Sequence, residues 1–62
     1  MSKVFLFFNG FYHEEDFDAC VDMMDDDIRE RVEDELPPCS DQEFLDRYCQ
    51  IYEEEFGEEF QV

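Results

Sequence analysis

The chain has 62 residues, of which 20 are acidic and 4 are Lys or Arg, so its formal net charge is −16. A surface this negative repels nucleic acid and anionic membranes, which excludes direct binding to either, and it attracts basic surfaces within about one Debye length. The composition, with 44% hydrophobic and 18% aromatic residues, is not that of a disordered acidic tail and predicts one small folded domain over residues 1–62.

The first predicted elements are two strands joined by a tight turn. An apolar run over residues 4–8 is followed by Asn9 and Gly10, and then by Phe11, Tyr12 and His13. An Asn-Gly pair between β-prone residues is typical of a type I′ hairpin turn, because both central positions need a positive φ. The sequence therefore predicts strands at about residues 3–8 and 11–13.

Apolar residues then recur at steps of three and four, which indicates helix. Asp16 is the candidate N-cap, and the prolines at 37–38 end the segment. Three adjacent Asp residues at 25–27 start helices better than they continue them. We therefore predict two helices, at about residues 17–24 and 26–35, with a single long helix as the alternative. The apolar face consists of Phe17, Cys20, Val21, Met24, Ile28 and Val32.

A third helix is predicted from Ser40 onward. Ser40 and Glu43 match the capping box, with Cys39 and Phe44 at the positions of a hydrophobic staple. Gly57 is the expected left-handed residue after the last turn. One broad arc of the helix is apolar and is made of Phe44, Leu45, Tyr48, Cys49, Ile51, Tyr52 and Phe56.

The end of the chain alternates, with Phe60 and Val62 facing the same way if residues 58–62 form a strand. We predict that this strand pairs with the first one; a frayed tail is the alternative. The predicted fold class is α+β, with a small antiparallel sheet (the N-terminal Asn-Gly hairpin plus the C-terminal strand) packed on two or three helices. The predicted core is Phe5, Phe7, Phe17, Val21, Met24, Ile28, Val32, Phe44, Leu45, Tyr48 and Tyr52.

Rows of carboxylates are the main candidate site. Side chains four residues apart on a helix lie about 6 Å apart along its axis. One ladder, continuous only if residues 16–36 form a single helix, is Asp18, Asp22, Asp26, Glu30 and Asp34. The outer face of the last helix adds Glu43, Asp46, Glu53 and Glu54. Such rows resemble a phosphate strand, so we expect these nine acids to bind Lys and Arg side chains of a partner, with a merely solvated face as the alternative. Of the few basic residues, Arg31 is expected to pair with Asp27 or Glu35.

Other chemistry has little support in the sequence. The acids at 22–27 lack the spacing and the Gly of an EF-hand loop. The lone His13 and the cysteines at 20, 39 and 49 match no usual zinc pattern, and their odd number without a CxxC spacing predicts reduced thiols in a cytoplasmic protein. Two glycines supply no phosphate loop. We therefore predict no enzyme, no cofactor and no specific metal site.

A resemblance follows from these residues. A very small, strongly acidic strand-and-helix chain with the ladder from Asp18 to Asp34 resembles the DNA-mimic inhibitors of bacteriophages and other mobile elements, of which anti-CRISPR proteins are the best-known group. Residues 16–21, 24–26 and 58–60 also resemble short phage-type proteins. The resemblance implies an inhibitor that occupies the DNA channel of a CRISPR complex in the cytoplasm of a bacterial host; it assigns no residue a role by motif.

The predicted function is thus inhibition of a basic nucleic-acid-binding protein or complex by mimicry of DNA charge, without direct contact to nucleic acid or membrane. A monomer is the favoured state, with a dimer as the alternative. One alternative is a protein-interaction adaptor that binds through an exposed aromatic patch at Phe8, Phe11 and Tyr12, with the acids serving solubility alone. A second alternative is a module that responds to divalent cations.

Overall fold

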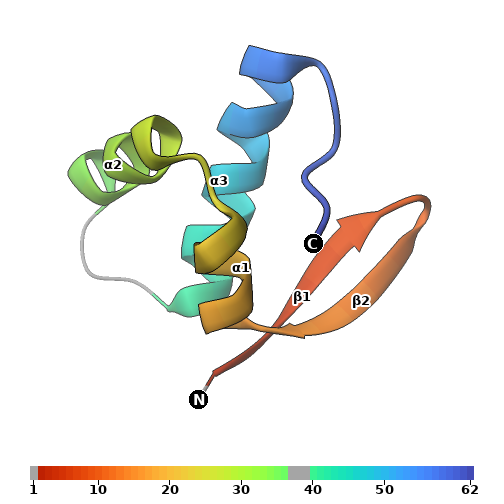
Figure 1. The fold of residues 1–62 in the computed structure, drawn as a ribbon. Coiled ribbons are helices and arrows are strands. Elements are labelled where there is room, and N and C mark those ends of the chain that lie inside the picture. Colours follow the sequence, from red (N-terminus) through yellow and green to blue (C-terminus); the bar gives the residue numbers. More distant parts are fainter. Residues whose placement is uncertain (1, 37–39) are drawn as a thin grey trace.

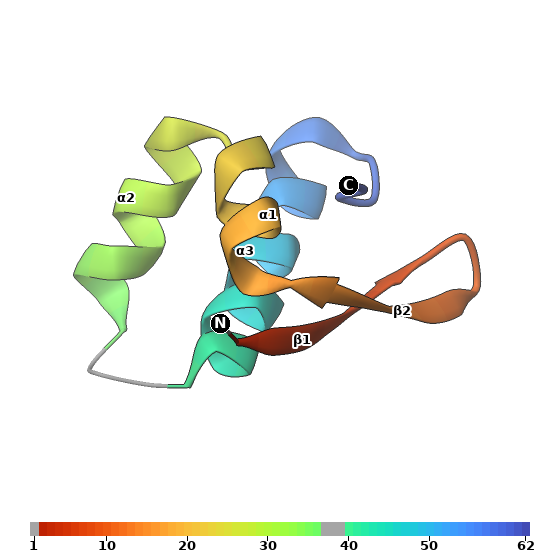
Figure 2. The ribbon, with the colours of Figure 1, turned by 60° about the horizontal axis from the view of Figure 1, so that its bottom comes forward.

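The computed structural model describes residues 2–36 and 40–62. The elements follow one another as β1 (Lys3–Phe8), β2 (Phe11–Asp16), α1 (Phe17–Met23), α2 (Asp26–Glu35) and α3 (Asp41–Phe56) (Figure 1). They form a two-stranded antiparallel sheet with three helices, which confirms the predicted α+β class. Helix α3 packs against β1 on one side and α2 on the other, and α1 packs against β2 (Figures 1 and 2).

The hairpin forms around the predicted turn. Asn9 and Gly10 both have positive φ, 54° and 83°, as a type I′ turn requires. The second strand is longer than predicted and continues to Asp16, which lies opposite Lys3 in the register. The Lys3 ammonium lies 3.0 Å from the Asp16 carboxylate and closes the open end of the hairpin.

Residues 17–35 form two helices, as predicted. Asp25 separates them: its carboxylate accepts a hydrogen bond from the Ile28 N–H at 3.2 Å, and its own N–H donates to the Tyr48 hydroxyl at 2.8 Å. Asp16 precedes α1 in an extended conformation, but its side chain makes no capping hydrogen bond. The break after Met24 is therefore stabilised both by a local cap and by a contact from α3.

The ends of α3 are also those that the sequence predicted. The Ser40 hydroxyl accepts a hydrogen bond from the Glu43 N–H at 3.2 Å, as in a capping box. Gly57 has a φ of 69° and donates its N–H to the Glu53 carbonyl at 2.8 Å. The predicted staple contact of Cys39 lies outside the described residues.

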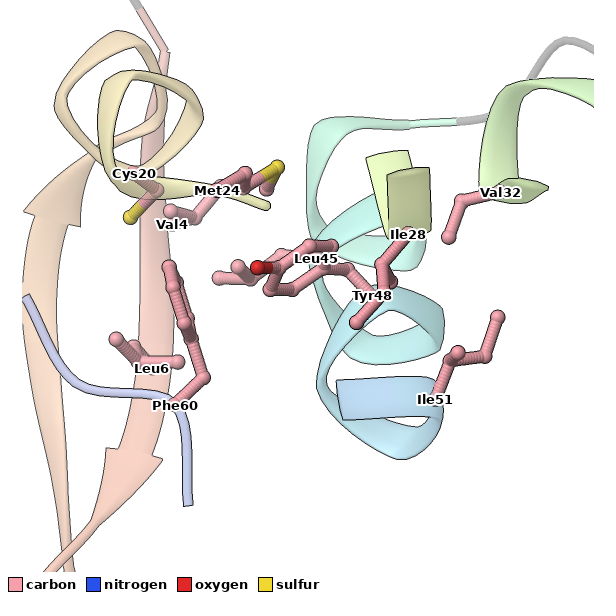
Figure 3. Packing of buried hydrophobic residues seen from close by; sticks show 10 residues of the cluster. All are labelled: Val4, Leu6, Cys20, Met24, Ile28, Val32, Leu45, Tyr48, Ile51 and Phe60. Carbon is pink, nitrogen blue, oxygen red and sulfur yellow. The ribbon is translucent and has the colours of Figure 1, made fainter. Parts of the chain in front are cut away.

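The core joins β1, the three helices and the C-terminal segment (Figure 3). Five of the predicted core residues are buried, namely Met24, Ile28, Val32, Leu45 and Tyr48. Four others are partly buried and pack against this cluster, namely Phe17, Val21, Phe44 and Tyr52. The buried residues that the prediction missed are Val4, Leu6, Cys20, Ile51 and Phe60.

The predicted orientation of β1 was wrong. Phe5 and Phe7 are 52% and 48% exposed, whereas Val4 and Leu6 are 1% exposed. Five consecutive apolar residues carry no alternation, so the sequence does not say which set faces inward. The inner face of β1 meets the large ring of Phe60 (Figure 3), and the smaller Val and Leu side chains fill the remaining space.

The predicted C-terminal strand does not form, and the alternative of a frayed tail is also wrong. Phe60 is 3% exposed, and its ring centroid lies 4.7 Å from that of Tyr48 and 5.3 Å from that of Tyr52. A third strand beside β1 is blocked, because the Gln42 side chain already accepts from the Phe5 N–H at 2.7 Å and donates to the Phe5 carbonyl at 2.8 Å. The tail is anchored by packing instead of by a strand ladder.

Candidate functional site

All four basic side chains of the chain are used in ion pairs within it. Lys3 pairs with Asp16 in the hairpin, and Arg29 lies 3.7 Å from Asp26 within α2. Arg31 pairs with Glu55 at 2.9 Å and Arg47 pairs with Glu35 at 3.0 Å. Sixteen of the 20 acidic side chains therefore have no ion-pair partner among residues 2–36 and 40–62.

The two ion pairs of Arg31 and Arg47 both join α2 to α3. The predicted partners of Arg31 on its own helix, Asp27 and Glu35, were wrong, because the packing of α2 on α3 brings Glu55 within reach of the guanidinium. Attachment of the two acidic helices to each other thus uses Arg31 and Arg47, while Arg29 pairs with Asp26 within α2, and the outward surfaces keep uncompensated carboxylates.

The first group of predicted acids is divided between two helices. Asp18 and Asp22 are exposed on α1, and Asp26, Glu30 and Asp34 are exposed on α2. The predicted condition for a continuous ladder, one long helix, is not met: the chain rises through α1 and turns down into α2 (Figure 2). The result is two short rows that run in different directions.

The second group of predicted acids shares the outer face of α3. Glu43, Asp46, Glu53 and Glu54 are all exposed. At a rise of about 1.5 Å per residue, they extend over roughly 16 Å of helix. The Asp46 carboxylate also accepts a hydrogen bond from Gln42 at 3.0 Å, which ties this face to β1 through the Gln42 contacts with Phe5.

The prediction of an aromatic patch at Phe8, Phe11 and Tyr12 was confirmed for the exposure of Phe11 and Tyr12 but was wrong in grouping the three residues on one surface. Phe8 is partly buried and stacks on the His13 ring at a centroid distance of 3.9 Å. Phe11 and Tyr12 are 70% and 73% exposed, but consecutive residues of a strand point to opposite faces. The register places Phe8 opposite Phe11 on one face of the hairpin, whereas Tyr12 lies on the other face with Phe7.

A different aromatic group lies on the outer face of the hairpin. Tyr12 is opposite Phe7 in the register, and Phe5 follows two residues earlier on the same face. A groove of about 320 Å³ runs between this face and α3, with Asp46, Cys49 and Glu53 in its lining. Two facts are needed to place these aromatic residues from the sequence. One is the strand register, which the turn at residues 9–10 fixes, and the other is which face of β1 is buried.

The remaining chemistry of the described residues is limited. They contain no group of three or more His, Cys, Asp or Glu side chains placed to hold a metal ion. None of the helices described is long and apolar enough to cross a membrane. Burial, together with Glu53 and Asp46, raises the pKa of the Cys49 thiol to about 12, and burial raises the pKa of the Cys20 thiol. Neither thiol has the low pKa of a reactive cysteine.

Comparison with protein families identifies the relatives of the chain. The family model of anti-CRISPR protein AcrIC5 matches residues 9–60, which is most of the sequence. The chain belongs to the AcrIC5 family of anti-CRISPR proteins. A search of curated proteins finds no match. Membership confirms the resemblance to small anti-CRISPR proteins and makes the chain an inhibitor that binds a CRISPR effector or complex.

Proposed function

We propose that the chain inhibits its CRISPR effector by covering, in place of target DNA, a basic surface that binds DNA. The observation that carries this proposal is that sixteen of the 20 carboxylates lack an ion-pair partner among the described residues, while every Lys and Arg is paired within the chain. A surface with this composition attracts Lys and Arg side chains and repels DNA itself.

The proposed contact residues are the nine exposed acids of the two groups: Asp18, Asp22, Asp26, Glu30, Asp34, Glu43, Asp46, Glu53 and Glu54. Neighbouring members of the rows on α1 and α2 are four residues apart, about 6 Å along the helix axis, which lets several phosphate-binding side chains engage them at once. Inhibition then needs only steric and electrostatic occupation, with no bond made or broken, in the cytoplasm of the host by a monomer.

The test uses single charge reversals that change the net charge equally. Glu30→Lys probes the row on α2, Glu54→Lys probes the outer face of α3, and Glu58→Lys is the matched control outside both groups. Affinity for a purified CRISPR effector complex that the chain inhibits is measured by biolayer interferometry at several salt concentrations. A reversal at a contact should weaken binding at least about tenfold, and the control should lower only the association rate, by a few-fold.

The outcomes separate the two groups. Loss confined to Glu30→Lys or to Glu54→Lys identifies the face that meets the effector. Binding by all three variants equal to that of the unmodified chain, or an affinity that does not fall with added salt, would reject the carboxylate surface as the contact.

A further inference from the structure

The outer face of the hairpin carries three aromatic side chains that the fold leaves uncovered. Phe5, Phe7 and Tyr12 are 52%, 48% and 73% exposed. On the opposite face, Val4 and Leu6 point toward Cys20 and Phe60 (Figure 3), so the core lies on the other side of the sheet. These three rings, called the aromatic face below, are not part of the hydrophobic core.

The aromatic face is ordered by its own contacts. The rings of Phe7 and Tyr12 lie 4.9 Å apart at an interplanar angle of 64°, an edge-to-face pair across the two strands. The backbone of Phe5 is held to α3 by two hydrogen bonds with the Gln42 side-chain amide. The rings thus form a pre-arranged surface, which lowers the ordering cost of binding.

Carboxylates border the aromatic face. Asp46 and Glu53 line the groove between this face and α3, and Glu14 lies opposite Phe5 in the strand register. Arg47 also lines the groove, but it is committed to Glu35 and to the Gln50 side chain. The groove therefore presents apolar rings with negative charge at their edges.

This combination fits a guanidinium. An Arg side chain stacks on an aromatic face through its planar cation, and its five N–H donors match carboxylates. A second copy of this chain is a poor occupant, since each copy carries a net charge of −16 and would place like charges in the contact. A basic surface that binds nucleic acid carries exposed Arg side chains of the kind that this groove would bind.

We infer that the aromatic face and the groove beside α3 bind an Arg side chain presented by the DNA-binding surface of the CRISPR effector. The inference rests on the proposed function and adds to it an apolar, salt-resistant anchor beside the carboxylates. The outer face of α3 connects the carboxylate surface to the aromatic groove, because Asp46 and Glu53 belong both to the predicted acidic set and to the lining of the groove.

The experiment compares two neighbouring residues of β2. Tyr12→Ser removes a ring from the aromatic face, and Phe11→Ser removes an equally exposed ring from the other face of the same strand. Affinity for the purified effector complex is measured at low and high salt. We expect Tyr12→Ser to bind about tenfold more weakly at both salt concentrations and Phe11→Ser to stay within about twofold of the unmodified chain.

A second pair of variants tests the nature of the contact. Phe7→Leu keeps an apolar side chain but loses the aromatic ring, and Phe7→Ser loses both. Equal losses for the two variants support stacking of a cation on the ring. Full affinity of Phe7→Leu with a loss only for Phe7→Ser would overturn the assignment of an Arg side chain, because a plain apolar contact would then suffice.

A measurement on the unmodified chain removes any dependence on how the variants fold. Tetranitromethane should nitrate Tyr12, which is 73% exposed, and not Tyr48, which is fully buried. Bound effector should protect Tyr12. Unchanged nitration of Tyr12 in the complex, or equal affinities of Tyr12→Ser and Phe11→Ser, would overturn the inference, as would a dimer of the free chain that Tyr12→Ser dissociates.

Failure of the proposed function gives a different pattern. If DNA does not compete with the chain but Tyr12→Ser still weakens binding, the aromatic face binds an Arg side chain outside the DNA-binding surface. The proposed function and the location assigned to the Arg side chain are then both wrong, and only the aromatic contact itself is supported. If the charge reversals weaken binding and DNA competes, but Tyr12→Ser has no effect, the proposed function stands and this inference fails.

Discussion

Substitution of Phe60 tests directly whether the C-terminal segment contributes to the hydrophobic core that stabilises this acidic chain. The Phe60 ring is 3% exposed and packs on Tyr48 and Tyr52, so the C-terminal segment belongs to the core although it forms no strand. Phe60→Ala removes this ring. Buried Phe→Ala substitutions cost about 3–5 kcal/mol, and we expect about 3 kcal/mol here, because the segment around Phe60 forms neither helix nor strand and can partly relax into the space.

That loss is large for so small a protein. At roughly 0.05–0.15 kcal/mol per residue, the whole chain has a free energy of unfolding of about 3–9 kcal/mol. A loss of about 3 kcal/mol lowers the Tm by roughly 12–24 °C in a chain of this size. Phe60→Ala should therefore be marginally folded at best, even though it leaves every carboxylate in place.

The assay is urea unfolding followed by far-ultraviolet circular dichroism. Val62→Ala is the control, because Val62 lies two residues further along and is 38% exposed. We expect the control to change the free energy of unfolding by less than about 0.5 kcal/mol. A cost of under about 1 kcal/mol for Phe60→Ala would refute the inclusion of the C-terminal segment in the core.

Three further predictions concern the hydroxyl contact, the charge and the thiols. Tyr48→Phe removes the acceptor of the Asp25 N–H and should cost about 1–2 kcal/mol in urea unfolding; no loss would show that water replaces the hydroxyl. Added NaCl, from about 0.02 M to about 0.5 M, should raise the Tm by several degrees because it screens like charges; a Tm independent of salt would contradict the destabilising role of the carboxylates. The raised pKa values of Cys49 and Tyr48 mean that the folded chain holds these protons more tightly than the unfolded chain. The contribution of Cys49 to stability is therefore complete below about pH 9 and is lost as the pH rises toward about 12, and Cys49→Ala should reduce this alkaline loss; an identical pH profile for the variant would contradict the burial of the thiol.

The local signals in the sequence were sufficient to predict the elements. Asn9-Gly10 fixed the turn, Ser40 with Glu43 fixed the start of α3, and Gly57 fixed its end, because each of these depends on the conformation or hydrogen bonds of adjacent residues. The division of residues 17–35 into two helices was predicted for the same reason, from a cap at Asp25–Asp27.

The tertiary contacts could not be predicted in the same way. The run from Val4 to Phe8 is apolar on both faces, so the choice between them depends on what packs against β1. The third strand was an extrapolation from two alternating residues, and the Gln42 side chain occupies the backbone groups that it would have used. Contacts from far along the sequence decide both questions.

The nine predicted acids are all exposed, but only the fold says which of them share a surface. The break at Asp25 separates the α1 and α2 rows, and the packing of α3 leaves Glu43, Asp46, Glu53 and Glu54 together on its outer face. The aromatic face was missed, because its three residues come together only when the strand register and the orientation of β1 are both known.

The proposed mode of inhibition requires the chain and target DNA to exclude each other from the effector. The direct measurement is an order-of-addition experiment with fluorescent chain, purified effector complex and a target DNA duplex, analysed by native gel and by anisotropy. Effector loaded with the chain should fail to bind DNA, and effector loaded with DNA should fail to bind the chain. A stable complex that contains effector, DNA and chain together, with each affinity undiminished, would contradict the mechanism.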